Sequence, residues 1–439
     1  MRCFFALFVR LRADSCRQER FRTVSGASIY KEKMKFMSEV KRQEKNYILA
    51  TVVTVAVFCM GQIPGSIDAA ISKISTAFNL SSTAGLYVTT VACLVSVAFS
   101  ILLGFVAGKK IGFKPLLIFC AAIEFIAGVV PFFAENYVVL LILRGLFGIG
   151  YGGMQSMENT VAAKLVSPER RAKVLGLGMF FGFGMNCILQ FIGGVLADFG
   201  WNYVFLNHLL LIIPLVIVII GCTKLDFTVY DDVPAAEGAA KEESAAASSK
   251  LTAPVFMMWI LMLFAGCMIS PLLIGCSFLS EAINDSATVA GIVAVCFSVG
   301  CMIGGLAYPP IYKKLQRGAL PLFLIIGAIG LIGSAAARNI VLLCIMIFIG
   351  GFGFAMIQSM AMMILTMSVS SSRVAFVSAI MMALFNFGVF LSSTYEELVG
   401  KITGDTLYAP IYVGAVIFVI FAVVYFIFTP LKKQEKKAE

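Results

Sequence analysis

The chain has 439 residues, of which 60% are hydrophobic and only 13% are charged, and its formal net charge is +10. A soluble globular domain holds roughly 25% charged and roughly 45–50% apolar residues, so this composition excludes an ordinary soluble protein and indicates an integral membrane protein. The excess of basic residues does not indicate nucleic-acid binding, because no folded basic domain is available to carry such a patch.

Residues 1–46 precede the first apolar segment and are predicted to form a cytoplasmic tail. They are basic and polar, and the apolar run CFFALFV at residues 3–9 is at the short limit for a signal peptide and lacks a small-residue cleavage site. A second interpretation is that translation starts at Met34 or Met37, since MSEVKRQEKNY is an ordinary lead-in to a first span.

Twelve apolar segments are long enough to cross a bilayer, which takes roughly 20 residues of helix, because a helix satisfies its own backbone in hydrocarbon. Their centres lie near residues 57, 95, 124, 150, 185, 212, 267, 298, 328, 352, 384 and 418. The first segment is the least regular, because Gly61 and Pro64 interrupt it before Asp68. The pattern predicts an all-α membrane protein with twelve transmembrane helices.

The basic residues predict the orientation, because cytoplasmic loops of membrane proteins are enriched in Lys and Arg. With both termini inside, the inner loops and the tail carry Lys109, Lys110, Lys114, Arg170, Arg171, Lys173, Lys313, Lys314, Arg317, Arg373, Lys432, Lys433, Lys436 and Lys437. The opposite loops carry mostly acidic residues: Asp68, Glu135, Asp198, Glu281, Asp285, Glu396 and Glu397, against Lys73, Arg338 and Lys401. We therefore expect a multi-pass protein of the plasma or inner membrane with both termini in the cytoplasm.

Residues 229–250 interrupt the apolar pattern. They are rich in Ala, Ser and Glu and hold almost no large apolar side chains, so they cannot bury enough surface to order themselves. This segment separates two groups of six spans. The expected organisation is an N-terminal six-helix bundle over residues 47–222, a cytoplasmic linker over 223–253, a C-terminal six-helix bundle over 254–430 and a tail over 431–439.

A repeat relates the two groups of spans. GIGYGGMQSM at residues 148–157 recurs as GFGFAMIQSM at residues 351–360, at an offset of 203, and the same offset carries VSPERRA at residues 166–172 onto VSSSRVA at residues 369–375. Two further matches in order, at offsets of 208 and 204, join Cys59-Met60 to Cys267-Met268 and Lys109-Lys110 to Lys313-Lys314. These matches indicate duplication of a six-span unit, as is common in transporters whose solute binds where the repeats meet.

Several motifs resemble those of the major facilitator superfamily. LGFVAGKKIGFKPLL at residues 103–117 resembles that family's loop between spans 2 and 3. The resemblance implies a conformational-switch loop that contains Gly104, Lys109, Lys110, Gly112 and Lys114. Lys109 stands where the family usually has Asp, and Phe113 where it usually has Arg.

Three further segments carry the same resemblance: RGLFGIG at residues 144–150, SPERRAKVLGL at residues 167–177, and FIGG with GWNYVF at residues 191–194 and 200–205. The resemblance, with its layout of six spans, a linker and six more, covers nearly all of residues 46–430. It implies two pseudo-symmetric six-helix bundles in which spans 1, 4, 7 and 10 line a central cavity. The Gly-Pro pair typical of drug antiporters in span 5 is absent, which weakens an assignment to drug efflux.

Span 4 carries the most informative set of polar residues. Arg144, Tyr151, Gln155 and Glu158 fall within roughly 60° of each other at about 100° per residue, so they share one helix face. Ionisable groups inside a span normally face the bundle interior. We predict that Arg144 binds an anionic group or a carboxylate and that Glu158 accepts a proton or cation. Alternatively, Glu158 lies near the inner interface and pairs with Lys164.

The repeat distinguishes shared from unshared residues. Arg144 and Glu158 correspond to Ile347 and Ala361, whereas the neutral pair Gln155-Ser156 corresponds to Gln358-Ser359. Charges in only one half suit energy coupling, and the shared Gln-Ser pairs suit solute hydrogen bonds across one cavity. Alternatively, the glutamines bond to backbone carbonyls between helices.

The remaining polar positions are weaker candidates. Gln62, Asn186, Gln190 and Asn386 either line the cavity or hold helices together. For Glu124 in span 3 and His208 in span 6, structural roles are the better interpretation.

Other chemistries lack a motif. Gly148, Gly150 and Gly153 satisfy G-x-G-x-x-G, but a span offers no strand–helix setting for a dinucleotide, so we interpret them as helix-packing residues. The sequence has no phosphate loop, its cysteines lie singly along the spans, and His208 is its one histidine, so neither a cofactor nor a metal is expected.

The sequence therefore predicts a monomeric secondary transporter of a small organic solute, coupled to protons and not an enzyme. Arg144 weakly favours a solute with a carboxylate or another anion. The rival hypotheses are efflux of lipophilic compounds by proton antiport and a non-transporting membrane sensor.

Overall fold

The computed structural model describes residues 46–63, 65–106, 112–227, 253–369 and 371–428. The residues from Leu49 onward form one compact unit. The long helices are α3 (Tyr47–Gly61), α5 (Ser82–Val106), α6 (Phe113–Val129), α7 (Tyr137–Leu165), α8 (Pro168–Phe199), α9 (Ile212–Lys224), α11 (Ala253–Leu273), α13 (Ala287–Leu315), α14 (Ala319–Ala336), α15 (Ile340–Ser368), α16 (Ser371–Thr403) and α17 (Ala409–Phe428). The described residues contain no strand, and the all-α prediction is confirmed.

Shorter helices complete several of these elements. They are η1 (Asp68–Ala70), α4 (Ile71–Ala77), η2 (Val130–Phe133), η3 (Trp201–Leu211), α12 (Cys276–Glu281) and η4 (Gln316–Gly318). Among the described residues, eleven helical segments are long and apolar enough to cross a membrane, and α3 is a shorter apolar helix of 15 residues. The twelve predicted spans are therefore all helical, and the first is the shortest because α3 ends at Gly61, where the sequence indicated an interruption.

Helices α7 and α15 show the repeat in atomic detail. Each has 29 residues, and their first residues, 137 and 340, are again 203 positions apart. The side chain of Asn136 accepts a hydrogen bond from the backbone N–H of Val139, and that of Asn339 from Leu342, both at 2.9 Å. Such an N-cap satisfies one of the free amides at a helix start and contributes about 1 kcal/mol. This pair of caps belongs to the repeat, although the sequence comparison did not identify it.

The glycines of α7 allow it to pack closely between two neighbours. A methyl group on Gly148 would collide with the backbone of Ala92 in α5, and one on Gly150 with the backbone of Glu124 in α6. In the second half, Gly351 of α15 lies in the same way against α13. The interpretation of these glycines as helix-packing residues fits these contacts.

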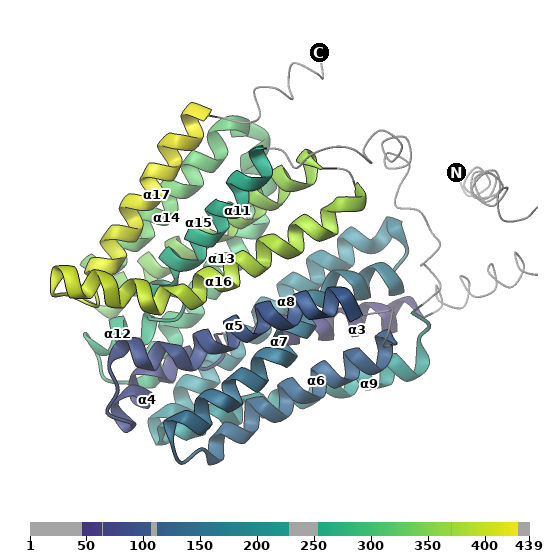
Figure 1. Ribbon diagram of the computed structural model, residues 1–439, viewed down its shortest axis with the longest axis horizontal. Helices are drawn as coiled ribbons and strands as arrows, with labels where there is room; N and C mark the ends of the chain where they lie inside the picture. Colours follow the sequence, from purple (N-terminus) through teal and green to yellow (C-terminus); the bar gives the residue numbers. More distant parts are fainter. Residues whose placement is uncertain (1–45, 64, 107–111, 228–252, 370, 429–439) are drawn as a thin grey trace, which may run out of the picture. The chain divides into compact units, whose positions relative to one another are not determined.

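The two halves meet along two pairs of helices, α5 with α16 and α8 with α13 (Figure 1). Thr90 and Ser393 share a hydrogen bond of 3.2 Å across the first pair. We call the end at which α8 stops and α13 starts the latch end. The opposite end, at which α9 stops and α11 starts, we call the linker end.

One carboxylate makes four hydrogen bonds between the halves at the latch end. Asp198, in the last turn of α8, accepts hydrogen bonds from the backbone N–H groups of Ala287 and Thr288 at 2.8 and 3.0 Å. The hydroxyl groups of Ser286 and Thr288 donate to it at 3.0 and 2.6 Å. A carboxylate is favourable at a helix N-terminus because free N–H groups and the helix dipole are directed at it. Asp198 of the N-terminal half thus caps α13 of the C-terminal half.

Candidate solute and proton site

Arg144 lies in the middle of the N-terminal half and is fully buried. Its Nε donates to the backbone carbonyl of Val88 at 2.9 Å, and its guanidinium carbon lies 4.3 Å from the ring centroid of Phe147. Its two terminal nitrogens have no hydrogen-bond partner. A buried cation is costly unless anions lie close to it, and Asp68 and Glu124 are the carboxylates that act on it electrostatically. The sequence left two partners open for Arg144, an anionic ligand or a carboxylate of the protein, and this geometry favours the carboxylate.

Asp68 is buried, which corrects its assignment to an outer loop. It lies in η1, where its Oδ1 accepts from the Thr89 hydroxyl at 3.0 Å and its Oδ2 has no partner. Glu396, also assigned to a loop, is buried within α16. Both assignments fail because the hydropathy criterion ends a span where the sequence becomes less apolar. In the structure the chain stays helical and buried beyond that point, although its side chains are polar. The break at Gly61 and Pro64 was the signal that the first span extends past them.

Glu124 lies on α6 beside the closely packed Gly150 of α7. Its side chain is fully buried, and neither of its oxygens has a hydrogen-bond partner. Its charge interacts with those of Glu158 and Arg144. Glu124 therefore belongs to the same buried group of ionisable side chains as Asp68, Arg144 and Glu158, which we call the ionisable cluster.

Glu158 is buried but borders accessible space. The side-chain amide of Gln62 donates to both of its oxygens, at 2.9 and 3.0 Å, and Gln62 is only partly buried. Gly61, the last residue of α3, makes this contact possible because a side chain there would collide with Glu158. Lys164, the alternative partner, instead donates to the backbone carbonyl of Phe227 at 3.4 Å.

Gln155 connects the two halves. It donates to the Tyr151 hydroxyl at 2.8 Å, and its side-chain oxygen accepts from Asn386 of α16 at 2.9 Å. Asn386 also lies 3.4 Å from the Ser96 hydroxyl. Gln155 therefore bonds to side chains and not to the backbone carbonyls that the alternative interpretation required.

The two Gln-Ser pairs do not meet each other. Gln358 donates to the sulfur of Met382 on α16 at 3.6 Å. Ser156 and Ser359 each donate to a backbone carbonyl of their own helix, at 2.7 and 2.8 Å. In this conformation each pair bonds to other partners, and the expectation that both pairs reach one solute cavity stays a prediction. Both glutamines contact α16 instead, at positions one helical turn apart.

Asn186 and Gln190 of α8 both reach Ser298 of α13. Asn186 donates to the Ser298 hydroxyl at 3.2 Å, and that hydroxyl donates to Gln190 at 2.9 Å. All three side chains are buried. In this conformation they hold the halves together, which is one of the two roles that the sequence left open for the two amides.

His208 is buried in η3 and bonds to the Ser66 hydroxyl at 2.9 Å. Its other ring nitrogen lies 3.3 Å from the backbone carbonyl of Phe205. These contacts give it a structural role.

The structure describes three of the predicted switch-loop residues, Gly104, Gly112 and Lys114, and leaves Lys109 and Lys110 outside the described residues. Lys114 donates to the backbone carbonyl of Leu225 at 2.8 Å. Within the described part of the chain, this bond ties the start of α6 to the end of α9, both in the N-terminal half.

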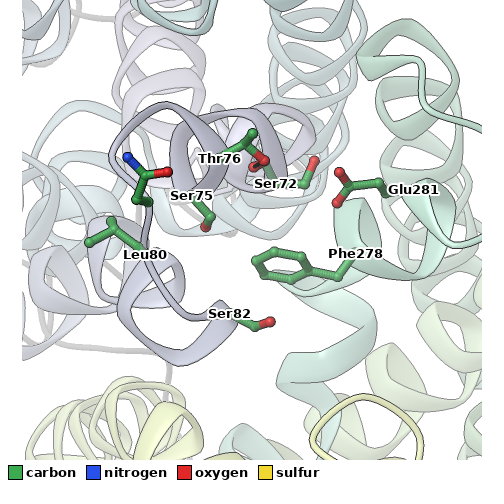
Figure 2. Close-up of a pocket in the computed structure, with 8 residues that line it drawn as sticks. Ser72, Ser75, Thr76, Leu80, Ser82, Phe278 and Glu281 are labelled. Atoms are coloured by element: carbon green, nitrogen blue, oxygen red, sulfur yellow. Dashed lines mark hydrogen bonds between the residues drawn. The ribbon is translucent and has the colours of Figure 1, made fainter.

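A surface pocket of about 350 Å³ lies at the latch end between α4 and α12 (Figure 2). It is lined by Ser72, Ser75, Thr76, Asn79, Leu80, Ser82, Phe278 and Glu281. The hydroxyls of Ser75 and Thr76 already donate to backbone carbonyls in the first turn of α4. The pocket is separate from the ionisable cluster. Among the described residues, no group of three or more His, Cys, Asp or Glu side chains could hold a metal ion.

Comparison with known proteins agrees with the repeat. Residues 53–275 and residues 258–439 each match the Major Facilitator Superfamily, so each half matches the same family on its own. The chain belongs to the Major Facilitator Superfamily. Members of this superfamily are transport proteins, and the chain is a multi-pass membrane protein of this family. The expected family and fold class are confirmed.

Two curated proteins are similar in sequence over part of the chain. The multidrug transporter protein MdtP of Bacillus subtilis is 29% identical over 181 residues, which are 39% of this chain and 32% of that protein. The vacuolar basic amino acid transporter 2 of Saccharomyces cerevisiae is 26% identical over 121 residues, 27% of this chain and 25% of that protein. The chain thus spans about a third or less of the length of these relatives.

Solved structures match over nearly the whole fold. A D-xylose–proton symporter superposes with a TM-score of 0.70 at 16% identity, covering 87% of this chain and 97% of that one. The nucleoside transporter NupG gives 0.65 at 13% identity, covering 87% and 98%. The xylose transporter XylE from E. coli, in a partially occluded inward-open conformation, gives 0.66 at 15% identity, covering 88% and 98%. At these identities the likeness shows the fold alone.

Proposed function

We propose that this chain is a secondary active transporter of a small organic solute, that its two halves alternate access to the site between them, and that proton movement drives it. The observation that carries the proposal is the ionisable cluster, in which Asp68 and Glu124 act electrostatically on Arg144 and Glu158 acts on Glu124, all four being buried. If all four were ionised, a net of two negative charges would be buried. Because burying unpaired charge is costly, protons must enter and leave with any change in exposure.

Glu158 is the carboxyl group best placed to exchange its proton. Its hydrogen-bond partner Gln62 is partly exposed, and so is Gln155, one turn before Glu158 on α7. Glu124, by contrast, is enclosed by the closely packed α6 and α7. A group that exchanges protons needs a route to water, and the exposure pattern gives that route to Glu158.

The class of solute is inferred from the burial of Arg144 and from the solutes of the similar proteins. The sequence favoured an anion because of Arg144, but the guanidinium is fully buried beside carboxylates, which removes that support. The relatives named above carry drugs, basic amino acids, a nucleoside or a sugar, so a small organic solute is consistent with all of them. The symporter that shares the fold is proton-coupled, which supports the coupling ion.

Orientation and membrane remain part of the proposal. The lysines and arginines of the loops favour both termini in the cytoplasm, in a plasma or inner membrane. We propose that the chain acts as a monomer, because each half supplies residues to one shared site. The domain boundaries 47–222 and 254–430 stand as proposed from the sequence.

Efflux of lipophilic compounds is a second candidate. Thioether and aromatic side chains of α15 and α16 lie beside Gln358, and a multidrug transporter is among the relatives. Altered drug tolerance on overexpression would support efflux, and growth on a single solute would support uptake.

Proton coupling can be tested with purified protein in liposomes. A thermal-shift screen of sugars, nucleosides, amino acids and organic cations selects a solute, and internal pH is then followed after that solute is added. We expect solute-dependent proton movement with the wild type, its loss in Glu158→Gln, and its retention in the matched control Glu396→Gln, which alters a buried glutamate of α16 outside the ionisable cluster. Unchanged proton movement in Glu158→Gln would contradict the proposed coupling, and no movement of any solute would favour a sensor.

A further inference from the structure

A line of contacts joins α15 and α16 in the C-terminal half. We call it the thioether seam, and it consists of Phe354, Gln358 and Met362 on α15 and Ser378, Met382 and Phe385 on α16. The rings of Phe354 and Phe385 stack at 5.3 Å, Gln358 donates to the Met382 sulfur at 3.6 Å, and Ser378 donates to the Met362 sulfur at 3.2 Å. The contacts follow one another at about one helical turn along both antiparallel helices.

The seam faces the N-terminal half. Asn386 follows Met382 by one helical turn on α16, so the two share a face, and Asn386 bonds to Gln155 of α7. Gln358, Met362 and Met382 are only partly buried, and the two methionines also pack against the core of the C-terminal half. Partly buried side chains next to an inter-half hydrogen bond are the ones that a solute between the halves would contact.

The residues of the N-terminal half that lie across from the seam differ from it in chemistry. Across from the seam, α3 and α7 present the amides of Gln62 and Gln155 and the carboxyl group of Glu158. At equivalent positions of the repeat, Tyr151 and Glu158 of α7 are replaced by Phe354 and Ala361 of α15. One side therefore accepts hydrogen bonds and positive charge, and the other offers polarisable apolar surface.

We propose that the solute is an amphipathic organic cation whose ammonium group binds on the Glu158 and Gln62 side and whose apolar part lies against the thioether seam. This inference rests on the proposed transport function of the same site. A carboxylate is the strongest acceptor for an ammonium donor. Methionine adapts its shape to different apolar groups, and aromatic faces add contact area.

Two other solute classes fit the geometry less well. An anion would meet Glu158, while Arg144 is fully buried and stacked on Phe147 and so is not presented to the solute. A sugar would lose hydrogen bonds to water that the seam does not replace, because thioether sulfurs are weak acceptors. Unmade hydrogen bonds of a polyol in such a site cost about 1–3 kcal/mol each.

The test uses the purified full-length protein and isothermal titration with four probes: 4-phenylbutylamine, 4-phenylbutanol, 4-phenylbutyrate and D-xylose. We expect the amine to bind at least tenfold more tightly than the carboxylate or the sugar. Glu158→Gln should weaken amine binding about tenfold and leave binding of the uncharged alcohol unchanged, which also shows that this variant is folded.

The seam is tested by Met382→Gln and Met362→Gln. Each should weaken binding of both the amine and the alcohol severalfold, whereas the matched control Met367→Gln, on another face of α15 with a 51% exposed side chain, should not. Equal affinity for amine and carboxylate, or unchanged affinity in both seam variants, would overturn the inference. If the carboxylate or xylose binds and drives proton movement while the amine does not bind, the transport function stands and the solute class is wrong.

Discussion

Helices α7 and α15 occupy equivalent places in the two halves, and they have the same length and the same kind of N-cap. Their side chains nevertheless differ at three interior positions, where Arg144, Tyr151 and Glu158 of α7 correspond to Ile347, Phe354 and Ala361 of α15. All six are buried. Both halves thus keep the N-cap and the packing glycine, while the ionisable side chains at these three positions lie in the N-terminal half alone.

The largest effect is expected when the positive charge of Arg144 is introduced at the equivalent position of the C-terminal half. Ile347 is fully buried, and Ile347→Arg would place a cation at a site that has no equivalent of Glu124. Gly150 packs against Glu124, whereas its repeat mate Gly353 packs against Gly327. An unpaired buried charge costs several kcal/mol. We expect a large drop in unfolding temperature in detergent, measured by a thermal melt.

The control for this prediction is Ile347→Leu, which conserves volume and should cost less than about 1.5 kcal/mol. A thermal melt of Ile347→Arg that matches the control would show that the C-terminal half tolerates charge as well as the N-terminal half does. The comparison between α7 and α15 would then lose its physical basis.

The inter-half amide contact should have a smaller effect. Asn386→Leu removes the donor to Gln155, a hydrogen bond of 2.9 Å, and should destabilise the contact between the halves by about 1 kcal/mol. Gln358→Leu removes only a bond to the Met382 sulfur and should cost less. Crosslinking between cysteines introduced into α5 and α16 would measure the separation of the halves, and a larger effect of Gln358→Leu would reverse the expected order.

The two halves also differ at the latch end, and this difference should affect the conformation of the protein. The repeat mate of Asp198 is Lys401, which does not cap a helix of the other half but pairs with Glu397 on its own helix at 2.6 Å. Asp198→Ala removes the carboxylate that accepts from the first two amides of α13, while Ser286 still caps Val289, and it should cost about 1 kcal/mol because a carboxylate at a helix N-terminus contributes about that much.

The measurement is the rate at which a thiol reagent labels a cysteine placed at Ser72 in the latch-end pocket. We expect labelling to rise about fivefold in Asp198→Ala, which is what about 1 kcal/mol corresponds to. Lys401→Ala, which alters an exposed ion pair, should leave it unchanged. Equal labelling in both variants would show that the cap does not hold the latch end closed.

Several features were predictable because they depend on local sequence. The lengths of the apolar segments predicted the spans, and the matches at an offset of 203 predicted the repeat. Gly148 and Gly150 predicted that helices pack closely there. The helical period also placed Arg144, Tyr151, Gln155 and Glu158 in the interior, where all but Gln155 are buried and Gln155 is partly so.

The pairings could not be predicted, because periodicity shows which face of a helix a residue occupies but not which helix it meets. Gln155 meets Asn386 although 231 positions separate them. Asp68 was missed for a different reason. Its helix is interrupted, so a hydropathy criterion ends before it, while the chain continues inside the protein.

The hydrogen bond from Asn386 to Gln155 also bears on affinity. If the solute uses Gln155, as the sequence predicts, then in this conformation Asn386 is an intramolecular competitor that occupies the acceptor before any solute arrives. The measured dissociation constant then exceeds the intrinsic one by the reciprocal of the fraction of molecules in which that amide has moved away. A weak affinity in this protein would therefore reflect a site that binds its own side chain, and each departure of α16 from α7 would both open the path and release the binding group.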